Sequence, residues 1–171
     1  MKKNIVLVGF MGTGKTLVSK RLSEILKRQR ISTDEAIEKK EQRSIVEIFQ
    51  DSGEEYFRRQ EKKVVAEISQ REDLVVDCGG GVVLQQENID HLKRNGILFY
   101  LAASPEIIYK RIKNQTHRPL LNIPHPPTKI QELLNQRKSF YEQAHFTINT
   151  DPQSIEDTTQ EVLSKLSHDG S

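Results

Sequence analysis

The glycine-rich segment GFMGTGKT constrains the fold of this chain more than any other feature of the sequence. It matches the pattern G-x-x-x-x-G-K-[ST], with the fixed positions held by Gly9, Gly14, Lys15 and Thr16. The β-branched run NIVLVG precedes it and predicts a strand that is buried on both faces. The run KTLVSKRLSEILKR places its apolar residues at helical spacing. A strand, a glycine-rich turn and a helix in this order are typical of a loop that binds nucleotide phosphates.

Each part of that loop has a physical reason. Glycines let the backbone turn so that its N–H groups point at the phosphates, and the following helix adds the positive end of its dipole. Lys15 supplies a full positive charge for the β- and γ-phosphates, and Thr16 offers a hydroxyl group to Mg²⁺. We therefore expect the nucleotide to be bound by Gly12, Thr13, Gly14, Lys15 and Thr16.

Strand-like and helical segments alternate through the rest of the sequence. The runs RIST, DLVVDCGGG, ILFYLAA and FTINT predict four more strands, with helical stretches between them. Gly53 is expected to separate two of these helices, and the proline-rich run THRPLLNIPHPPT cannot form a regular helix. The alternation predicts an α/β fold of three layers, in which a five-stranded parallel sheet lies between helices, as one domain over residues 1–171.

Charge and cysteine content exclude several classes of protein. The formal net charge is only +2, which implies no broad nucleic-acid-binding field, and the basic run KRQR at 27–30 is expected to be a solvated helix end. A single cysteine, Cys78, excludes a disulfide framework, fits a reducing compartment and is expected to be a buried thiol. The apolar run near the N-terminus is too short for a signal peptide or a membrane span. We expect a cytoplasmic protein that binds neither nucleic acid nor membranes.

The phosphate loop alone does not decide what the nucleotide is used for. GTPases usually carry an N-K-x-D or T-K-x-D signature late in the chain, and this sequence has neither. Motor and transporter ATPases are generally longer and bring further elements. A short chain with a proline-rich, arginine-bearing segment in its second half favours a kinase of small molecules or nucleotides.

Four further segments carry chemistry, and each also has a plainer interpretation. Asp34 follows a predicted strand, and it could cap a helix. Arg58 and Glu61 stand three residues apart on one helix face, where they could form a surface ion pair. The glycines at 79–81 follow a strand, at the edge where open α/β sheets place ligands, and they could form a simple turn. Arg137 lies in a late helix and could be solvated.

Taken together, these segments resemble the shikimate kinase family, from about Asn4 to Pro152. The phosphate loop has the family's form G-x-M-G-x-G-K-[ST], and STDEAIE partly matches its D-x-D segment. GEEYFRRQE at 53–61 matches the family's G-E-x-x-F-R-x-x-E pattern, and Gly79, Gly80 and Gly81 match its three glycines. RPLL at 118–121 matches its R-P-L-L segment, and Arg137 with Tyr141 matches its R-x-x-x-Y pattern.

The resemblance implies phosphorylation of the 3-hydroxyl of shikimate by ATP, with Mg²⁺, in the pathway to aromatic amino acids. It implies a P-loop kinase fold, a mobile lid at about 112–126 and a shikimate-binding region at about 32–61. We also expect a monomer. Asp34, Lys15 and Arg118 are the implied catalytic residues, and Arg111 and Arg118 join the ATP site. The residues implied to bind shikimate are Asp34, Arg58, Glu61, Gly79, Gly80, Gly81 and Arg137.

One departure from the family pattern concerns the metal. Ser32 replaces the first aspartate of D-x-D, which in the family helps to hold Mg²⁺, and a neutral hydroxyl is a weaker partner for a hard cation. We hypothesise that Asp77, at the end of the neighbouring strand, replaces that carboxylate beside Thr16; the alternative is that Asp77 only bonds loop amides. Two other functions stay open, a kinase of another acid such as gluconate and a nucleotide-binding homologue without turnover.

Overall fold

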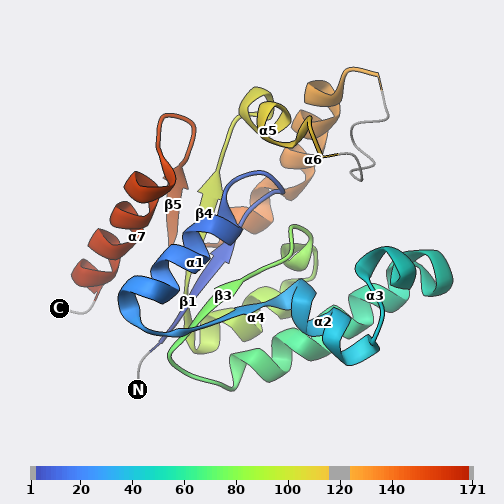
Figure 1. Cartoon of the computed structure of the whole chain (residues 1–171), viewed down its shortest axis with the longest axis horizontal. Helices are drawn as coiled ribbons and strands as arrows, with labels where there is room; N and C mark the ends of the chain where they lie inside the picture. Colours follow the sequence, from blue (N-terminus) through green and yellow to red (C-terminus); the bar gives the residue numbers. More distant parts are fainter. Residues whose placement is uncertain (1–2, 116–123, 170–171) are drawn as a thin grey trace.

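A computed structural model describes residues 3–115 and 124–169. Five strands form one parallel sheet in the order β2-β3-β1-β4-β5, and helices cover both of its faces (Figure 1). The strands are β1 (Asn4–Val8), β2 (Gln29–Ser32), β3 (Leu74–Asp77), β4 (Gly96–Ala102) and β5 (Phe146–Asn149). The predicted α/β class and five-stranded parallel sheet are confirmed.

The helices follow the strands in the expected alternation. They are α1 (Lys15–Leu26), α2 (Thr33–Glu41), α3 (Ile45–Ser69), α4 (Gln86–Arg94), α5 (Pro105–Ile112), α6 (Pro126–Tyr141) and α7 (Ile155–Asp169), with a short 3-10 turn η1 (Val82–Leu84). Within the described residues, no helix is both long enough and apolar enough to cross a membrane.

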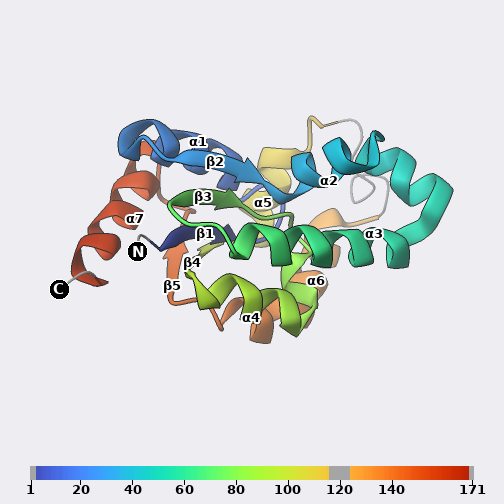
Figure 2. The ribbon, with the colours of Figure 1, turned by 90° about the horizontal axis from the view of Figure 1, so that it is seen from below.

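The strands alternate their side chains between two cores. Ile5, Leu7 and Phe99 face α1 and α7, whereas Val6 and Val8 face α3, α4 and the end of α6. Figure 2 shows the sheet edge-on between these two helix layers. Every residue of β1 is buried, which confirms the prediction of a strand covered on both faces.

Local backbone signals explain where several elements begin and bend. Gly53, at φ 82° and ψ 171°, kinks α3, so the two predicted helices form one run with a break at the expected residue. The sequence did not predict α2, which is capped by Ser32. It also excluded Pro126 and Pro127 from any helix, yet they form the first turn of α6, where proline is tolerated because no N–H partner is lost.

The register of the strands places the functional loops. Leu7 of β1 pairs with Asp77 of β3, and Asp77 pairs with Ser32 of β2, so these three residues form one row at the carboxyl edge of the sheet. The phosphate loop leaves β1 at this edge, and the glycine turn at 79–81 leaves β3 beside it. Open α/β sheets bind their ligands at such an edge.

Asn4 connects three segments at the opposite end of the sheet. Its buried amide nitrogen donates to the carbonyl oxygen of Arg71 at 2.8 Å, and its side-chain oxygen accepts from the backbone N–H of Leu74 at 3.0 Å. Asn4→Ala leaves the buried N–H of Leu74 without this acceptor, so we expect it to lower the free energy of unfolding by about 1–3 kcal/mol. Urea denaturation followed by circular dichroism measures this loss.

Asn95→Ala is the matched control, because Asn95 donates to the same Arg71 carbonyl oxygen from a more exposed position. In the part of the chain that the structure describes, the Asn95 side chain accepts no hydrogen bond from a buried backbone N–H. We therefore expect Asn95→Ala to lower the free energy of unfolding by less than half as much as Asn4→Ala does. Equal losses for the two variants would contradict the role given to Asn4.

Candidate functional site

A cavity of about 580 Å³ opens at the carboxyl edge of the sheet. The phosphate loop and the start of α1 form its centre, β2 and β3 end on one side of it, and α5 and the start of α7 lie on the other. It is lined by Met11, Gly12, Gly14, Lys15, Thr16, Leu17, Ser32, Asp34, Asp77, Cys78, Gly79, Gly80, Arg111, Gln115, Gln153, Ser154 and Ile155.

The phosphate loop has a backbone that only glycine adopts easily. Gly12 and Gly14 have φ angles of 78° and 95°, in the left-handed region. Because Gly14 stands at the N-cap of α1 and has no side chain to cap it, the first N–H groups of that helix are directed into the loop. Lys15 is buried, and its Nζ donates to the carbonyl oxygens of Gly9 and Phe10 at 2.7 and 2.9 Å. The loop therefore combines a full positive charge with a helix N-terminus, as the sequence predicted.

Asp77 lies beside the hydroxyl of Thr16. The Thr16 hydroxyl donates to Asp77 Oδ2 at 2.9 Å, although the two residues are 61 positions apart in sequence. Asp77 therefore bonds a side chain of the phosphate loop, and the alternative that it bonds only loop amides is wrong. A hydroxyl and a carboxylate are both oxygen ligands of the kind that Mg²⁺ prefers.

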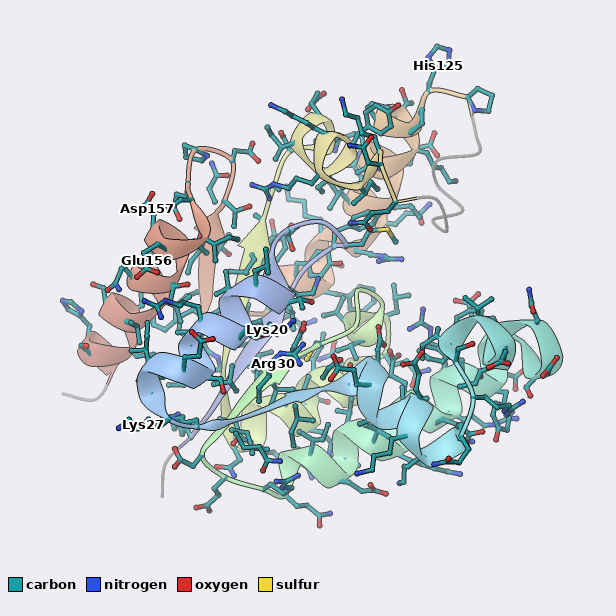
Figure 3. The ribbon with its side chains drawn as sticks, viewed as in Figure 1. Lys20, Lys27, Arg30, His125, Glu156 and Asp157 are labelled. Atoms are coloured by element: carbon teal, nitrogen blue, oxygen red, sulfur yellow. The ribbon has the colours of Figure 1, made fainter. Side chains whose placement is uncertain are left out.

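Arg30 was predicted both as the end of the solvated run KRQR and as the first residue of the strand RIST; the strand is confirmed, and the solvated helix end is wrong. Arg30 lies in β2, its side chain is only 14% exposed, and its Nη2 contacts Asp77 Oδ2 at 2.7 Å. Its Nε donates to the hydroxyl of Ser19 on α1 at 2.8 Å. Figure 3 shows Arg30 inside the molecule next to α1, whereas Lys27 lies at the outer edge, where α1 ends.

Ser32 and Asp34 stand at the start of α2, near Asp77. Ser32 is the N-cap, since its hydroxyl accepts from the backbone N–H of Glu35 at 3.3 Å, so the suggested capping role of Asp34 is wrong. Asp34 contacts the glycine turn, because a Cβ placed on Gly79 would lie 2.6 Å from Asp34 Oδ1. Burial and the nearby charge of Asp77 raise the pKa of Asp34, and the charge of Lys15 opposes them.

Arg58 and Glu61 form a buried pair and not the surface ion pair considered above. Arg58 Nη1 contacts Glu61 Oε1 at 2.8 Å, and the Glu61 side chain is 1% exposed. Burial raises the pKa of Glu61, while the Arg58 guanidinium opposes the shift. Among the described residues, Arg58 Nε and Glu61 Oε2 are buried without a hydrogen-bond partner. A Cβ on Gly81 would lie 2.5 Å from Arg58 Nη1, so only glycine leaves this guanidinium its place.

Arg137 reaches the same glycine turn from α6. Its Nη1 donates to the carbonyl oxygen of Gly80 at 3.1 Å, and its guanidinium lies 5.2 Å from the centre of the Phe10 ring. The Tyr141 hydroxyl donates to the same carbonyl oxygen at 3.1 Å. The interpretation of Arg137 as a solvated helix charge is therefore wrong, and Tyr141 has a structural role at the turn.

Arg111 lies on the other side of the phosphate loop. It donates to the carbonyl oxygen of Gly12 at 3.2 Å and to the hydroxyl and carbonyl oxygens of Thr150 at 3.0 Å each. Arg111 is an exposed charge on α5, and these hydrogen bonds hold its guanidinium at the rim of the cavity. The sequence-predicted residue Arg118 lies outside the described residues. His125, just beyond that gap, is described and exposed (Figure 3).

Cys78 is buried between the sheet and the glycine turn. It is 1% exposed, and burial raises the pKa of its thiol well above the usual value. A thiol in this environment is held in its unreactive form, which agrees with the prediction of a structural cysteine.

Comparisons with known proteins agree with each other. A family model described as shikimate kinase matches residues 11–167. Shikimate kinases of Caldanaerobacter subterraneus subsp. tengcongensis and Thermodesulfovibrio yellowstonii are 45% and 42% identical to this chain; each alignment covers 94% of the chain, and 94% and 93% of the respective relative. A solved structure of shikimate kinase from Acinetobacter baumannii in complex with shikimate superposes with a TM-score of 0.92 at 37% identity, over 99% of this chain and 95% of that one.

A gluconokinase from Sinorhizobium meliloti is also similar in fold. It superposes with a TM-score of 0.64 over 97% of this chain and 92% of that one, but only 17% of the residues are identical. This likeness shows the shared fold alone and gives no support to the gluconate alternative.

Glu61→Ala tests whether the buried pair holds Arg58. The substitution leaves a guanidinium that is only 17% exposed without its close carboxylate partner and opens a small cavity, so we expect the free energy of unfolding to fall by about 2–4 kcal/mol. Chemical denaturation measures the change. Glu55→Ala is the control, because Glu55 pairs with Arg59 at 3.0 Å on the same helix but is 90% exposed. We expect almost no change there, and a loss as large as that of Glu61→Ala would contradict the distinction.

Proposed function

This chain belongs to the shikimate kinase family, and from that premise we propose that it transfers the γ-phosphoryl group of ATP to the 3-hydroxyl of shikimate. The products are shikimate 3-phosphate and ADP, on the route to aromatic amino acids. The observation that carries this proposal is the convergence of Arg58 and Arg137, from two different helices, on one glycine turn beside the phosphate loop.

The two arginines suit a substrate that carries a carboxylate. A guanidinium group presents its N–H donors in a flat fork that matches the two oxygens of a carboxylate. Arg58 Nε is buried without a partner among the described residues, and an anion bound at the turn would satisfy it. Glu61 holds the other edge of this guanidinium, so Arg58 is already oriented before substrate arrives. Gly79, Gly80 and Gly81 leave room for the ring, and Gly80 and Gly81 offer backbone N–H groups.

Asp34 is proposed to orient the attacking hydroxyl group and accept its proton. It lines the same cavity as Lys15 and Thr16, so an alcohol bound at the glycine turn would meet both Asp34 and the terminal phosphate. Burial and the charge of Asp77 raise the pKa of Asp34, which makes its carboxylate a stronger proton acceptor, while the charge of Lys15 opposes this shift. A loose transition state for phosphoryl transfer requires positioning and charge compensation more than a strong base.

The nucleotide is proposed to bind along the phosphate loop, with its phosphates at residues 12–16 and its base toward Arg111. The family generally uses Mg²⁺ with ATP. The oxygen donors of Thr16 and Asp77 line the cavity together and fit this ion, and Ser32 is a weaker third donor. When bound, Mg²⁺ compensates charge on the β- and γ-phosphates. Arg118, by resemblance, adds positive charge over the transferred group from a lid at about 112–126.

The remaining expectations extend this proposal. We infer one kinase domain over residues 1–171, a shikimate-binding region at about 32–61, a monomer and a cytoplasmic location. The single unpaired thiol of Cys78 fits the reducing conditions of the cytoplasm.

Release of ADP in the presence of different acceptors tests the proposed reaction. We expect ADP to form rapidly when Mg-ATP and shikimate are both present, and at a low background rate with gluconate or with no acceptor. A coupled spectrophotometric assay measures this. Equal rates with gluconate would overturn the choice of substrate, and a background rate with every acceptor would favour a homologue without turnover.

Asp34→Asn separates chemistry from nucleotide binding. It keeps the size and much of the polarity of the side chain but removes the proton acceptor, so we expect kcat to fall by about 10²–10⁴-fold. The KM for ATP should change little, because the phosphate loop is intact. Steady-state kinetics with each substrate varied in turn gives both values. A kcat within threefold of the parent enzyme would show that Asp34 neither orients the hydroxyl nor accepts its proton.

A further inference from the structure

Arg30 is the charged group at this site that the proposed reaction does not use. Its guanidinium contacts Asp77 Oδ2 at 2.7 Å, Ser19 Oγ at 2.8 Å and both carboxylate oxygens of Glu35 at 3.3 Å. Glu35 is 65% exposed, so its contribution is screened by water. The pair with Asp77 is the buried one, with side-chain exposures of 14% and 7%.

Arg30 approaches Asp77 from behind the nucleotide cavity. Asp77 lines that cavity, whereas Arg30 lines a separate cavity between the β2 edge, α2 and α3, and only Ser32 borders both. Figure 3 shows the Arg30 side chain lying between β2 and α1. The guanidinium therefore neutralises Asp77 without occupying the space in which phosphates and a metal ion would lie.

The charge balance at the carboxylate follows from these contacts. Asp77 and Arg30 together carry no net charge, and the Thr16 hydroxyl donates to the same oxygen, Oδ2, that Arg30 contacts. Among residues 3–115 and 124–169, no three acidic, histidine or cysteine side chains are grouped closely enough to hold a metal ion by themselves. A divalent cation beside Thr16 would meet Asp77, whose charge Arg30 already compensates. Asp34, a second carboxylate that lines the cavity, interacts with the positive charge of Lys15.

We propose that Arg30 is a positioning and charge-compensating residue that makes metal binding at Asp77 depend on the nucleotide. With Arg30 in place, the carboxylate holds its orientation toward Thr16 but attracts a divalent ion only weakly. The phosphates of ATP or ADP add negative charge beside Asp77, and this charge attracts the metal ion although Arg30 compensates the carboxylate. This inference rests on the proposed position of the metal beside Thr16 and Asp77.

Binding of Mn²⁺ without nucleotide tests the proposal, with the free aqueous ion followed by electron paramagnetic resonance. Arg30→Gln removes the positive charge next to a buried carboxylate. We therefore expect the variant to bind Mn²⁺ at least about tenfold more tightly than the parent protein does. The double variant Arg30→Gln with Asp77→Asn should lose the whole gain, because the effect acts through Asp77. Arg30→Lys keeps the charge and should stay within about threefold of the parent affinity.

Arg28→Gln is the matched control. Arg28 precedes β2, is 19% exposed and pairs with Asp73 at 2.8 Å, away from the cavity. The substitution removes an arginine charge of similar exposure, whose partner Asp73 is 44% exposed, and we expect no change in Mn²⁺ affinity. If Arg30→Gln binds Mn²⁺ within twofold of the parent, or if the double variant keeps the gain, the proposal is overturned.

A measurement on the folded parent protein keeps the test valid if Arg30→Gln does not fold. Without nucleotide, the parent and Asp77→Asn should bind Mn²⁺ equally weakly, whereas with ADP the parent should bind it more tightly than Asp77→Asn does. Nucleotide-independent binding that requires Asp77 would overturn the role of Arg30. None of these readouts involves shikimate or turnover, so failure of this inference is distinguishable from failure of the proposed reaction.

Discussion

The pairing of β1 with β3 is the constraint on which the site depends. Because Leu7 stands opposite Asp77, the chain leaves both strands at the same level, and the phosphate loop and the glycine turn emerge side by side. The backbone N–H of Cys78 donates to the carbonyl oxygen of Leu7 at 3.1 Å, which continues this alignment one residue beyond the strand. A shift of one residue in this register would turn Asp77 to the opposite face of the sheet and away from Thr16. The hydrophobic alternation of the two cores opposes such a shift, so packing far below the cavity sets the geometry of its charged groups.

The sequence predicted well those features that have local signatures. The phosphate loop is recognisable because its glycines, lysine and threonine lie within eight residues, between a strand and a helix with clear periodicity. The sheet follows from continuous apolar runs, which a parallel strand buried on both faces requires. The placement of Arg58, Arg137 and the three glycines in one site came from resemblance to a family. Their separation in sequence gives no physical reason, by itself, for Arg137 to reach Gly80.

The sequence failed where a long-range contact overrides local character. KRQR reads as a solvated basic end because four polar residues follow an amphipathic helix. Its last two residues instead lie in β2, and parallel pairing with β3 brings Arg30 close to a carboxylate 47 positions away. A buried strand position occupied by arginine was the available signal, since arginine is seldom buried unless it is paired. The helix α2 was missed for a related reason, because Ser32 was considered only as a metal ligand and not as a helix cap.

The pair of Arg30 and Asp77 gives a physical reason for the serine at position 32. A carboxylate at position 32 would stand directly across from Asp77 in neighbouring strands, and like charges that face each other there repel. The row therefore carries one carboxylate, on β3, and the hydroxyl of Ser32 is used to cap α2. A lone carboxylate as deeply buried as Asp77 is costly unless a cation pairs with it, and β2 supplies that cation two residues earlier, as Arg30. Arg30, Ser32 and Asp77 are therefore physically coupled. An aspartate restored at position 32 alone would add a second negative charge opposite Asp77, and the positive charge of Arg30 is already paired with Asp77.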